Sequence, residues 1–464
     1  MELSPGQYAQ LIITCVIAVI VFASAYLYNE KYLIITIICL IPFQLITSRF
    51  GSLNMVLTYL LGFSLILSKK FTKFPLLWAI FFIIFSYITS LSQLESSKYA
   101  FHIIYMISIF SNFFLFLIVY NFFIKENDPR LFFKILIGLN ICVLIYAFIQ
   151  MAIGFEEYAF FNIGELALET NKSPDIEWMI EEKRLTGGPF AAPGINAIYL
   201  AIQIIILSFL ILHEKNKTKI AFFIGLCGLN FMIIIATGNR GAFISLICGL
   251  IFFFILFRKQ LGFAKIILMT SVFLIIFSAV SVIIISYTQY DTFLERLTQT
   301  EFHGLTPDTR QKVWDIAIKA IKEKPILGWG PNKISMGRKQ FEDEQGHQRK
   351  IDYSAIPSPH SLYLYLLYTL GIVGLTAYSI FFLSLYIRYF RAYKYESENN
   401  FLNNLPRLGI ILLTVFLIDQ IKLEFLRFRL TDFQHFIFML FGAFLAFSDK
   451  LRNLKSGTNY KVQL

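Results

Sequence analysis

The chain has 464 residues, of which 57% are hydrophobic and 15% are charged. A soluble globular protein carries roughly 25% charged residues, so the composition excludes that class and indicates a membrane protein. The five cysteines all lie inside apolar runs, which favours small core residues over a disulfide framework or a metal site.

Uncharged apolar runs long enough to cross a bilayer, about 17–25 residues, recur along the whole chain. The segment at about 408–421 is short, and Asp419, Lys422 and Glu424 lie at its end. The sequence predicts an all-α polytopic membrane protein with about 12–13 transmembrane helices and one large external loop that carries short helices. The expected spanning segments lie at about 10–27, 32–48, 53–68, 74–92, 101–124, 131–153, 193–212, 219–237, 242–257, 264–287, 361–386, 408–421 and 432–448.

Basic residues are distributed unevenly between the two sides of this arrangement. Because cytoplasmic loops of membrane proteins are rich in Lys and Arg, the side whose loops carry 21 of them is predicted to be cytoplasmic, and the side whose short loops carry five is predicted to be external. The net charge of +11 is then an orientation signal, and we expect no nucleic-acid partner. The predicted cytoplasmic set is Lys31, Lys69, Lys70, Lys73, Lys125, Arg130, Lys134, Lys215, Lys217, Lys219, Arg258, Lys259, Lys265, Arg388, Arg391, Lys394, Arg407, Lys450, Arg452, Lys455 and Lys461, and the set in the short external loops is Arg49, Lys98, Arg240, Arg427 and Arg429.

Three parts follow from this topology. Residues 1–287 are expected to hold transmembrane helices 1–10 with an external loop at 154–192. Residues 288–360 form the large external loop, and 361–464 carry the last transmembrane helices and a basic cytoplasmic tail.

The large loop contains the sequence LTPDTRQKVWDIAIKAIKEKP, which predicts a helix. Thr306 is the expected cap, Pro307 the first helical residue, and Pro325 the end of the pattern. The following GWGPNK predicts a tight turn. One face of this helix is apolar, which suits either the outer membrane surface or a cover over the spanning helices.

Few residues outside the apolar runs can carry chemistry, and those that can are all predicted to be external. They are Arg184 in EEKRLTGGPFAAPGINA, Arg240 in TGNRGAF and His360 in IPSPHSLYLYLLYTLGIVGL. Each has a purely structural interpretation. An arginine at a helix end commonly reaches lipid headgroups or helix carbonyls, Arg184 can pair with Glu181 or Glu182, and a histidine before a helix can cap it.

Taken together, the three residues indicate a more specific site. Polar groups near membrane depth are costly and tend to line cavities. Arginine suits bidentate binding of phosphate, and histidine suits proton transfer near neutral pH. Two arginines and one histidine on one face, each beside Gly or Pro turns, predict a site that holds a diphosphate and deprotonates a second substrate.

These blocks, in this order, resemble the O-antigen ligase and O-antigen polymerase superfamily. That family typically shows R-x-x-G-x-F-x-x-P-N, then T-x-S-R-G-A, then a loop with R-x-x-x-W, then H-N-x-x-L followed by a Gly-x-x-Gly helix. Arg310 and Trp314 match the loop motif, and Asn332 follows in PILGWGPN; all three are possible supporting residues. Asn239 stands where Ser is usual, and Ser361 where Asn is usual. The chain also has ten expected helices before the large loop, one more than the family's nine.

The resemblance implies transfer or polymerisation of a glycan from an undecaprenyl-diphosphate carrier onto an acceptor hydroxyl, at the outer face of the bacterial cytoplasmic (inner) membrane. Arg184 and Arg240 would bind the donor diphosphate, and His360 would complete the catalytic set. The implied reaction is inverting and needs no metal or cofactor. Its partners would be the carrier-linked donor, a glycan or lipid A core acceptor, and membrane lipids.

Two alternatives stay open. The first is a protein O-oligosaccharyltransferase, which differs only in its acceptor. The second is a polytopic transporter or flippase, which is disfavoured because such proteins place polar groups on broken helices at mid-membrane, whereas these charges cluster outside.

Overall fold

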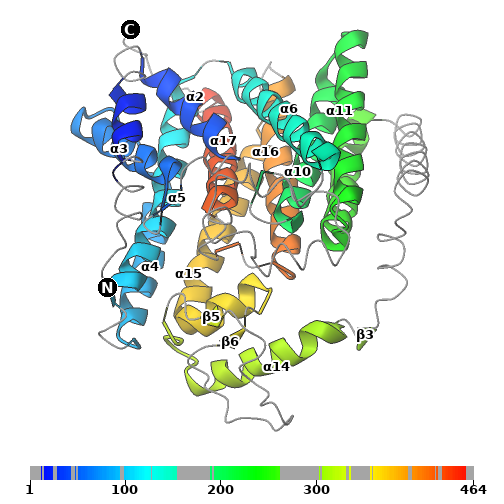
Figure 1. The fold of residues 1–464 in the computed structure, drawn as a ribbon. Helices are drawn as coiled ribbons and strands as arrows, with labels where there is room; N and C mark the ends of the chain where they lie inside the picture. The colour runs from blue at the N-terminus through cyan, green and yellow to red at the C-terminus, as the bar shows by residue number, and fades with distance from the viewer. Residues whose placement is uncertain are drawn as a thin grey trace.

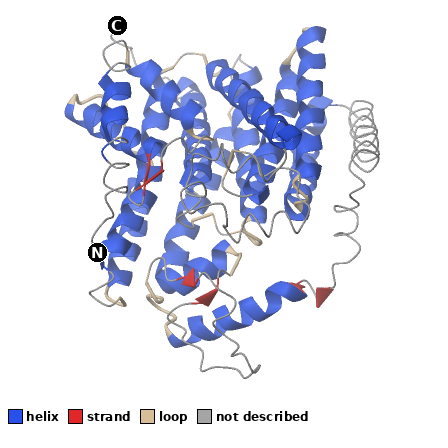
Figure 2. Cartoon of the chain, viewed as in Figure 1, coloured by secondary structure: helices blue, strands red, loops and turns tan. Residues whose placement is uncertain are grey.

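The chain is a helical bundle with a few very short strand pairs (Figures 1 and 2). The structure is a computed structural model, and it describes residues 12, 15–23, 29–42, 47–48, 51–94, 99–126, 128–153, 189–190, 193–261, 302–303, 306–330, 334–335, 356–357, 359–395, 400–423, 425–426 and 431–455.

The labelled helices are α2 (Glu30–Leu40), α3 (Leu53–Leu67), α4 (Leu77–Leu91), α5 (Tyr99–Lys125), α6 (Arg130–Ile153), α10 (Pro193–His213), α11 (Lys217–Ala236), α14 (Asp308–Glu323), α15 (Leu362–Tyr393), α16 (Asn400–Asp419) and α17 (Thr431–Lys455). A further helix runs over Arg240–Leu261. The strand pairs are β1 (Thr47–Ser48) with β2 (Gly51–Ser52) and β3 (Phe302–His303) with β4 (Thr306–Pro307), both antiparallel, and β5 (Ile334–Ser335) with β6 (Ile356–Pro357), parallel.

Within the described part of the chain, seven helices are long and apolar enough to cross a membrane. They are Tyr105–Lys125, Arg130–Ala152, Gly194–His213, Lys217–Ala236, Arg240–Leu261, Leu362–Tyr393 and Asn400–Asp419. Three shorter apolar helices, in α2, α3 and α4, accompany them. This confirms the predicted class of an all-α multi-pass membrane protein.

Several expected boundaries differ from the structure. The segment expected at 408–421 is the second half of α16, which begins at Asn400. The segment expected at 32–48 is too long, since α2 ends at Leu40 and residues 47–48 belong to β1. Residues 15–23 are helical, within the expected segment 10–27. The segment expected at 264–287 lies outside the described residues.

The start of the loop helix was also predicted incorrectly. Thr306 and Pro307 form β4, which pairs with β3, so α14 begins at Asp308 instead of at Pro307. The predicted end holds, because α14 stops at Glu323, ahead of Pro325. Both glycines of the following turn adopt left-handed backbone angles, with φ of +68° at Gly328 and +99° at Gly330.

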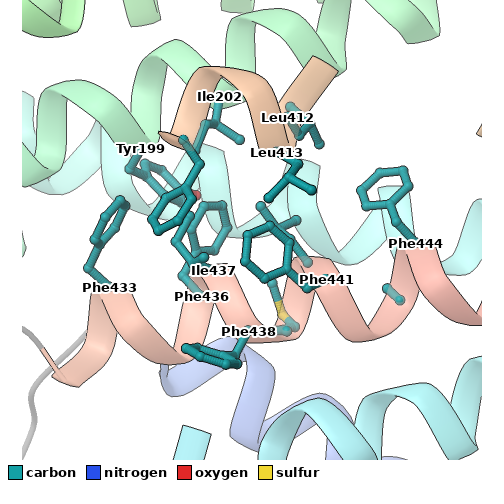
Figure 3. Close-up of a cluster of buried hydrophobic side chains, with 14 of the residues drawn as sticks. Tyr199, Ile202, Leu412, Leu413, Phe433, Phe436, Ile437, Phe438, Phe441 and Phe444 are labelled. Carbon is teal, nitrogen blue, oxygen red and sulfur yellow. The ribbon is translucent and has the colours of Figure 1, made fainter. Parts of the chain in front are cut away.

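The core of the bundle forms around α17, whose phenylalanines are buried on more than one face. Figure 3 shows Phe433, Phe436 and Phe441 beside residues of α10 and α16. On another side, the rings of Phe438 and of Phe113 in α5 lie 4.9 Å apart. Residues 433–448 are buried on every face, so α17 is a central helix even though it also carries polar residues such as Gln434 and His435 and charges at its C-terminal end.

Basic side chains hold one end of the bundle together. Lys31 forms an ion pair with Glu126 at 2.9 Å, and the Lys450 ammonium donates to the Glu126 carbonyl at 2.6 Å. Arg388, near the C-terminal end of α15, pairs with Asp449 of α17 at 2.9 Å. Residues predicted to be cytoplasmic in four separate segments therefore meet at one end, which we call the basic end. In Figure 1, α14 lies across the other end.

Candidate functional site

The sequence TGNRGAF forms a turn between α11 and the helix Arg240–Leu261. Gly238 adopts a left-handed conformation, φ +63°, directly after α11, which is the usual way for a helix to end. The side-chain oxygen of Asn239 accepts a hydrogen bond from the Ala242 amide at 2.9 Å and so caps the next helix. Arg240 is the first residue of that helix and is half-buried.

The first motif packs onto this turn through its C-terminal half. Gly194, at the start of α10, lies so close to Asn239 that an added Cβ would be 2.6 Å from the amide nitrogen. The neighbouring Phe190 is buried with its ring 4.9 Å from that of Tyr199. Arg184 lies outside the described residues, as does Asn332, so their predicted roles stay predictions.

His360 lies in a strained turn immediately before α15. Its φ is +46°, a left-handed conformation that costs a non-glycine residue roughly 1–2 kcal/mol. Such residues persist where the surroundings fix them, and they concentrate at functional sites. The His360 side chain is exposed, whereas Ser361 is buried. The Leu362 amide donates to the carbonyls of Gln420 and Leu423, both at 3.0 Å, which ties this turn to the segment after α16.

That same segment, residues 420–423, also holds the Arg240 turn. The Lys422 ammonium lies 3.1 Å from the side-chain oxygen of Asn239 and 2.8 Å from a carboxylate oxygen of Asp419. The structure therefore brings the turns that carry Arg240 and His360 to one end of the bundle, opposite the basic end. We call it the site end and define it by residues 237–243, 359–361 and 420–423.

The loop helix α14 supports the His360 turn. The indole nitrogen of Trp314 donates to the Pro359 carbonyl at 2.8 Å. Ala317 and Ala320 of α14 pack on Tyr368 of α15. The apolar face of α14 therefore packs on the spanning helix α15. This is the second of the two predicted alternatives, a cover over the spanning helices instead of a contact with the membrane surface. Arg310 lies within α14, although its side chain is not among those described.

The helix α15 is broken at Gly371, where φ is +64° and ψ is −164°. The backbone groups freed by the break are satisfied by the turn after α14: the Trp329 amide donates to the Tyr368 carbonyl at 2.8 Å, and the Ile372 amide donates to the Pro325 carbonyl at 2.9 Å. Non-helical backbone in a membrane protein requires such partners. The expected single helix at 361–386 is therefore two helices, of which the first, directly after His360, is held by the large loop.

Residues 225–379 match the family model of the O-antigen ligases. This part of the chain is therefore similar to O-antigen ligases. The matched region contains the TGNRGAF turn, α14, the PILGWG turn and the broken part of α15. No curated protein matches the chain significantly.

The O-antigen ligase match confirms the family resemblance read from the motifs. It supports glycan transfer of the O-antigen ligase or polymerase type, with glycan or lipid-linked substrates, in a multi-pass membrane protein. The first motif, with Arg184, lies before the matched residues.

Sequence reasoning missed one feature of the site end, the pair of Asp419 and Lys422. Asp419 is fully buried, and the Ser245 hydroxyl donates to its carboxylate at 3.3 Å. In the sequence, Asp419 and Lys422 were noted only as charges at the end of the short segment 408–421, and no role was predicted for them. The available signal was their rarity, since ionisable residues at the end of an apolar helix are retained mainly where they have a partner or a function.

Proposed function

We propose that this protein transfers a glycan from a polyprenyl-diphosphate carrier onto an acceptor hydroxyl at the site end of the bundle. The observation that carries the proposal is the convergence of the Arg240 and His360 turns on residues 420–423. Residues 420–423 contact both the turn that carries the proposed cation, Arg240, and the turn that carries the proposed proton acceptor, His360. The proposed reaction needs both groups.

Arg240 is suited to the donor diphosphate by its position. A cation in the first turn of a helix is opposed by the helix dipole, so Arg240 does not serve to stabilise its own helix. The same dipole and the free amides of the first turn favour an anion, which the guanidinium can bind in a bidentate way. Arg184, from the loop at 154–192, is the proposed second cation. Two guanidiniums then neutralise the diphosphate, and no metal is needed in the proposal.

His360 is the proposed general base. It lies at the N-terminal side of α15, where the helix dipole disfavours the imidazolium form and so keeps the ring neutral and able to accept a proton. The acceptor oxygen bonds to the anomeric carbon, its proton passes to His360, and the bond from that carbon to the diphosphate breaks. The diphosphate leaves with the electron pair, stabilised by the arginines. Attack opposite the leaving group inverts the anomeric centre.

The proposed location is the external face of the cytoplasmic membrane. The contacts of Lys31, Arg388 and Lys450 gather at the basic end, and basic segments favour the cytoplasmic side. The site end then faces outward, where carrier-linked glycans would be met by their acceptors.

The test is transfer by the purified protein in lipid nanodiscs, with a carrier-linked glycan as donor. Three acceptors separate the possibilities: lipid A core for a ligase, a second carrier-linked glycan for a polymerase, and a protein hydroxyl for an O-oligosaccharyltransferase. We expect transfer to one of them, lost in Arg240→Lys, which keeps the charge but not the planar fork. Absence of transfer to all three by folded protein, or full activity in Arg240→Ala, would contradict the proposal.

A further inference from the structure

Lys422 lies where the separate segments of the site end meet. Its ammonium contacts the Asp419 carboxylate at 2.8 Å and the Asn239 side-chain oxygen at 3.1 Å. Its stem occupies the space beside Gly241, where an added Cβ would collide with the last three atoms of the lysine side chain. The close approach of Lys422 thus requires glycine at 241.

The charge of Lys422 is compensated by Asp419 and does not form an independent phosphate site. Asp419 is fully buried, and a buried carboxylate is strongly disfavoured unless a cation accompanies it. The side chain of Lys422 is 20% exposed, so the pair is shielded from water on most sides. Beyond this neutralisation, Lys422 also donates a hydrogen bond to Asn239.

Asn239 links Lys422 to the turn that carries Arg240. Its side-chain oxygen accepts from both Lys422 and the Ala242 amide, and its amide nitrogen lies against Gly194. A side chain held from three sides has one orientation, and the residue that follows it in the chain is Arg240. The first turn of the helix Arg240–Leu261 is therefore fixed by a contact from the far end of α16.

We propose that Lys422 is a positioning residue, which through Asn239 holds the first turn of the helix Arg240–Leu261 and so aims the Arg240 guanidinium at the donor diphosphate. Lys422 itself does not touch the donor. The inference rests on the proposed function, because the donor diphosphate is the group that the Arg240 guanidinium would bind.

The competing explanation is that Lys422 only neutralises Asp419. A cycle of variants separates the two. Gly241→Ala keeps both charges but pushes the lysine stem away from Asn239. Asp419→Asn with Lys422→Ala removes the stem and leaves no unpaired buried charge. The triple variant adds the methyl group where no lysine remains to be displaced.

A second comparison uses two asparagines that cap helices at opposite ends of the bundle. Asn216 caps α11 through the Thr218 amide at 2.9 Å, as Asn239 caps the following helix, but no cationic side chain among the described residues is hydrogen-bonded to its oxygen. Serine can still cap in both places, although its short side chain cannot also reach Lys422. Asn239→Ser therefore breaks the bridge, and Asn216→Ser is the matched control.

The experiment measures the donor KM and kcat for transfer, the thermal midpoint, and hydrogen exchange of the amides at 238–242. We expect Gly241→Ala, Asn239→Ser and Asp419→Asn/Lys422→Ala each to lower kcat/KM for the donor by about tenfold, within the range of coupled neighbours, and to speed exchange at 238–242. The triple variant should be no worse than Asp419→Asn/Lys422→Ala, and Asn216→Ser should match the parent in transfer.

Two results would overturn the inference: additive effects of the Gly241 and Lys422 changes, or altered thermal midpoints with unchanged donor kcat/KM and unchanged exchange at 238–242. Failure of the parent protein to transfer any glycan would instead count against the proposed function. The exchange measurement would then still decide whether Lys422 holds the turn.

Discussion

The two ends of the bundle use charge in different ways. At the basic end, the partners are partly exposed: the side chain of Lys31 is 41% exposed, and that of its partner Glu126 is 18% exposed. At the site end, Asp419 is 0% exposed and its partner Lys422 20%. Exposed pairs contribute about 0–1 kcal/mol, whereas loss of one partner from a buried pair costs about 3–5 kcal/mol. We therefore expect the Lys31–Glu126 pair to be replaceable and the Asp419–Lys422 pair not to be.

Left-handed non-glycine residues occur at both ends of the bundle: Lys69 and Leu76 have φ of +55° beside the basic end, and His360 has φ of +46° at the site end. The basic end uses ordinary caps, such as the side chain of Asn216 before α11. There the amides of Asn216 and Lys215 donate to Glu214 and hold the pKa of its carboxyl below the usual value. The site end has a left-handed histidine, His360, and a helix interrupted at Gly371. In the described part of the chain, the helix break at Gly371 is therefore the backbone feature that distinguishes the site end, and a left-handed residue by itself is not.

The largest effect is expected at His360. Replacement of His360 by alanine should reduce turnover by about 10²–10⁴, the usual contribution of a general base. A transfer assay measures this loss of turnover. Expression and donor binding, measured separately, should stay near those of the parent protein. His360→Gln retains a hydrogen bond without titration, so near-normal activity in that variant would assign His360 to orientation of the acceptor. Lost donor binding in His360→Ala would place the residue in the diphosphate pocket.

The buried pair should give the next largest effect. Lys422→Ala leaves the Asp419 carboxylate buried without its cation, which should lower the free energy of unfolding by about 3–5 kcal/mol. Denaturant unfolding in detergent measures this. Simultaneous Asp419→Asn should restore much of the loss. A fully stable Lys422→Ala protein would mean that the two ends do not differ as described.

The broken helix gives a smaller effect on stability. Gly371→Ala forces an alanine into a backbone conformation, φ +64° and ψ −164°, that is essentially restricted to glycine and costs about 1–3 kcal/mol, and its Cβ would also meet the backbone of Ile326. The thermal midpoint should fall. Gly138→Ala in α6 is the matched control, because an added Cβ there meets nothing within 4 Å. Equal midpoints for the two variants would show that the break is not required.

The smallest effect is expected at the basic end. Lys31→Ala should change the free energy of unfolding by about 0–1 kcal/mol, as for other exposed ion pairs, and leave transfer unchanged. The same unfolding assay compares it directly with Lys422→Ala. A loss as large as that of Lys422→Ala would remove the distinction between the ends.

The sequence predicted the features that depend on local patterns. Apolar length predicted most of the spanning helices, and the polar interruptions TGNRGAF and PHS predicted turns where the structure has them. The break at Gly371 was not predictable, because TLGIVGL is uniformly apolar and the partners that satisfy it come from the PILGWG turn. The contact of Lys422 with Asn239 joins positions far apart in the chain, and the sequence around either residue does not predict it.

The central claim is that Arg240 and His360 share the external end, opposite the basic end. Labelling with a membrane-impermeant thiol reagent in intact cells tests it most directly, using single cysteines in a background without the native five. Arg240→Cys and His360→Cys should react in intact cells, whereas Lys259→Cys, at the other end of the helix Arg240–Leu261, should react only after permeabilisation. Labelling of Arg240→Cys and His360→Cys from opposite sides, or labelling of Lys259→Cys alone in intact cells, would contradict the account.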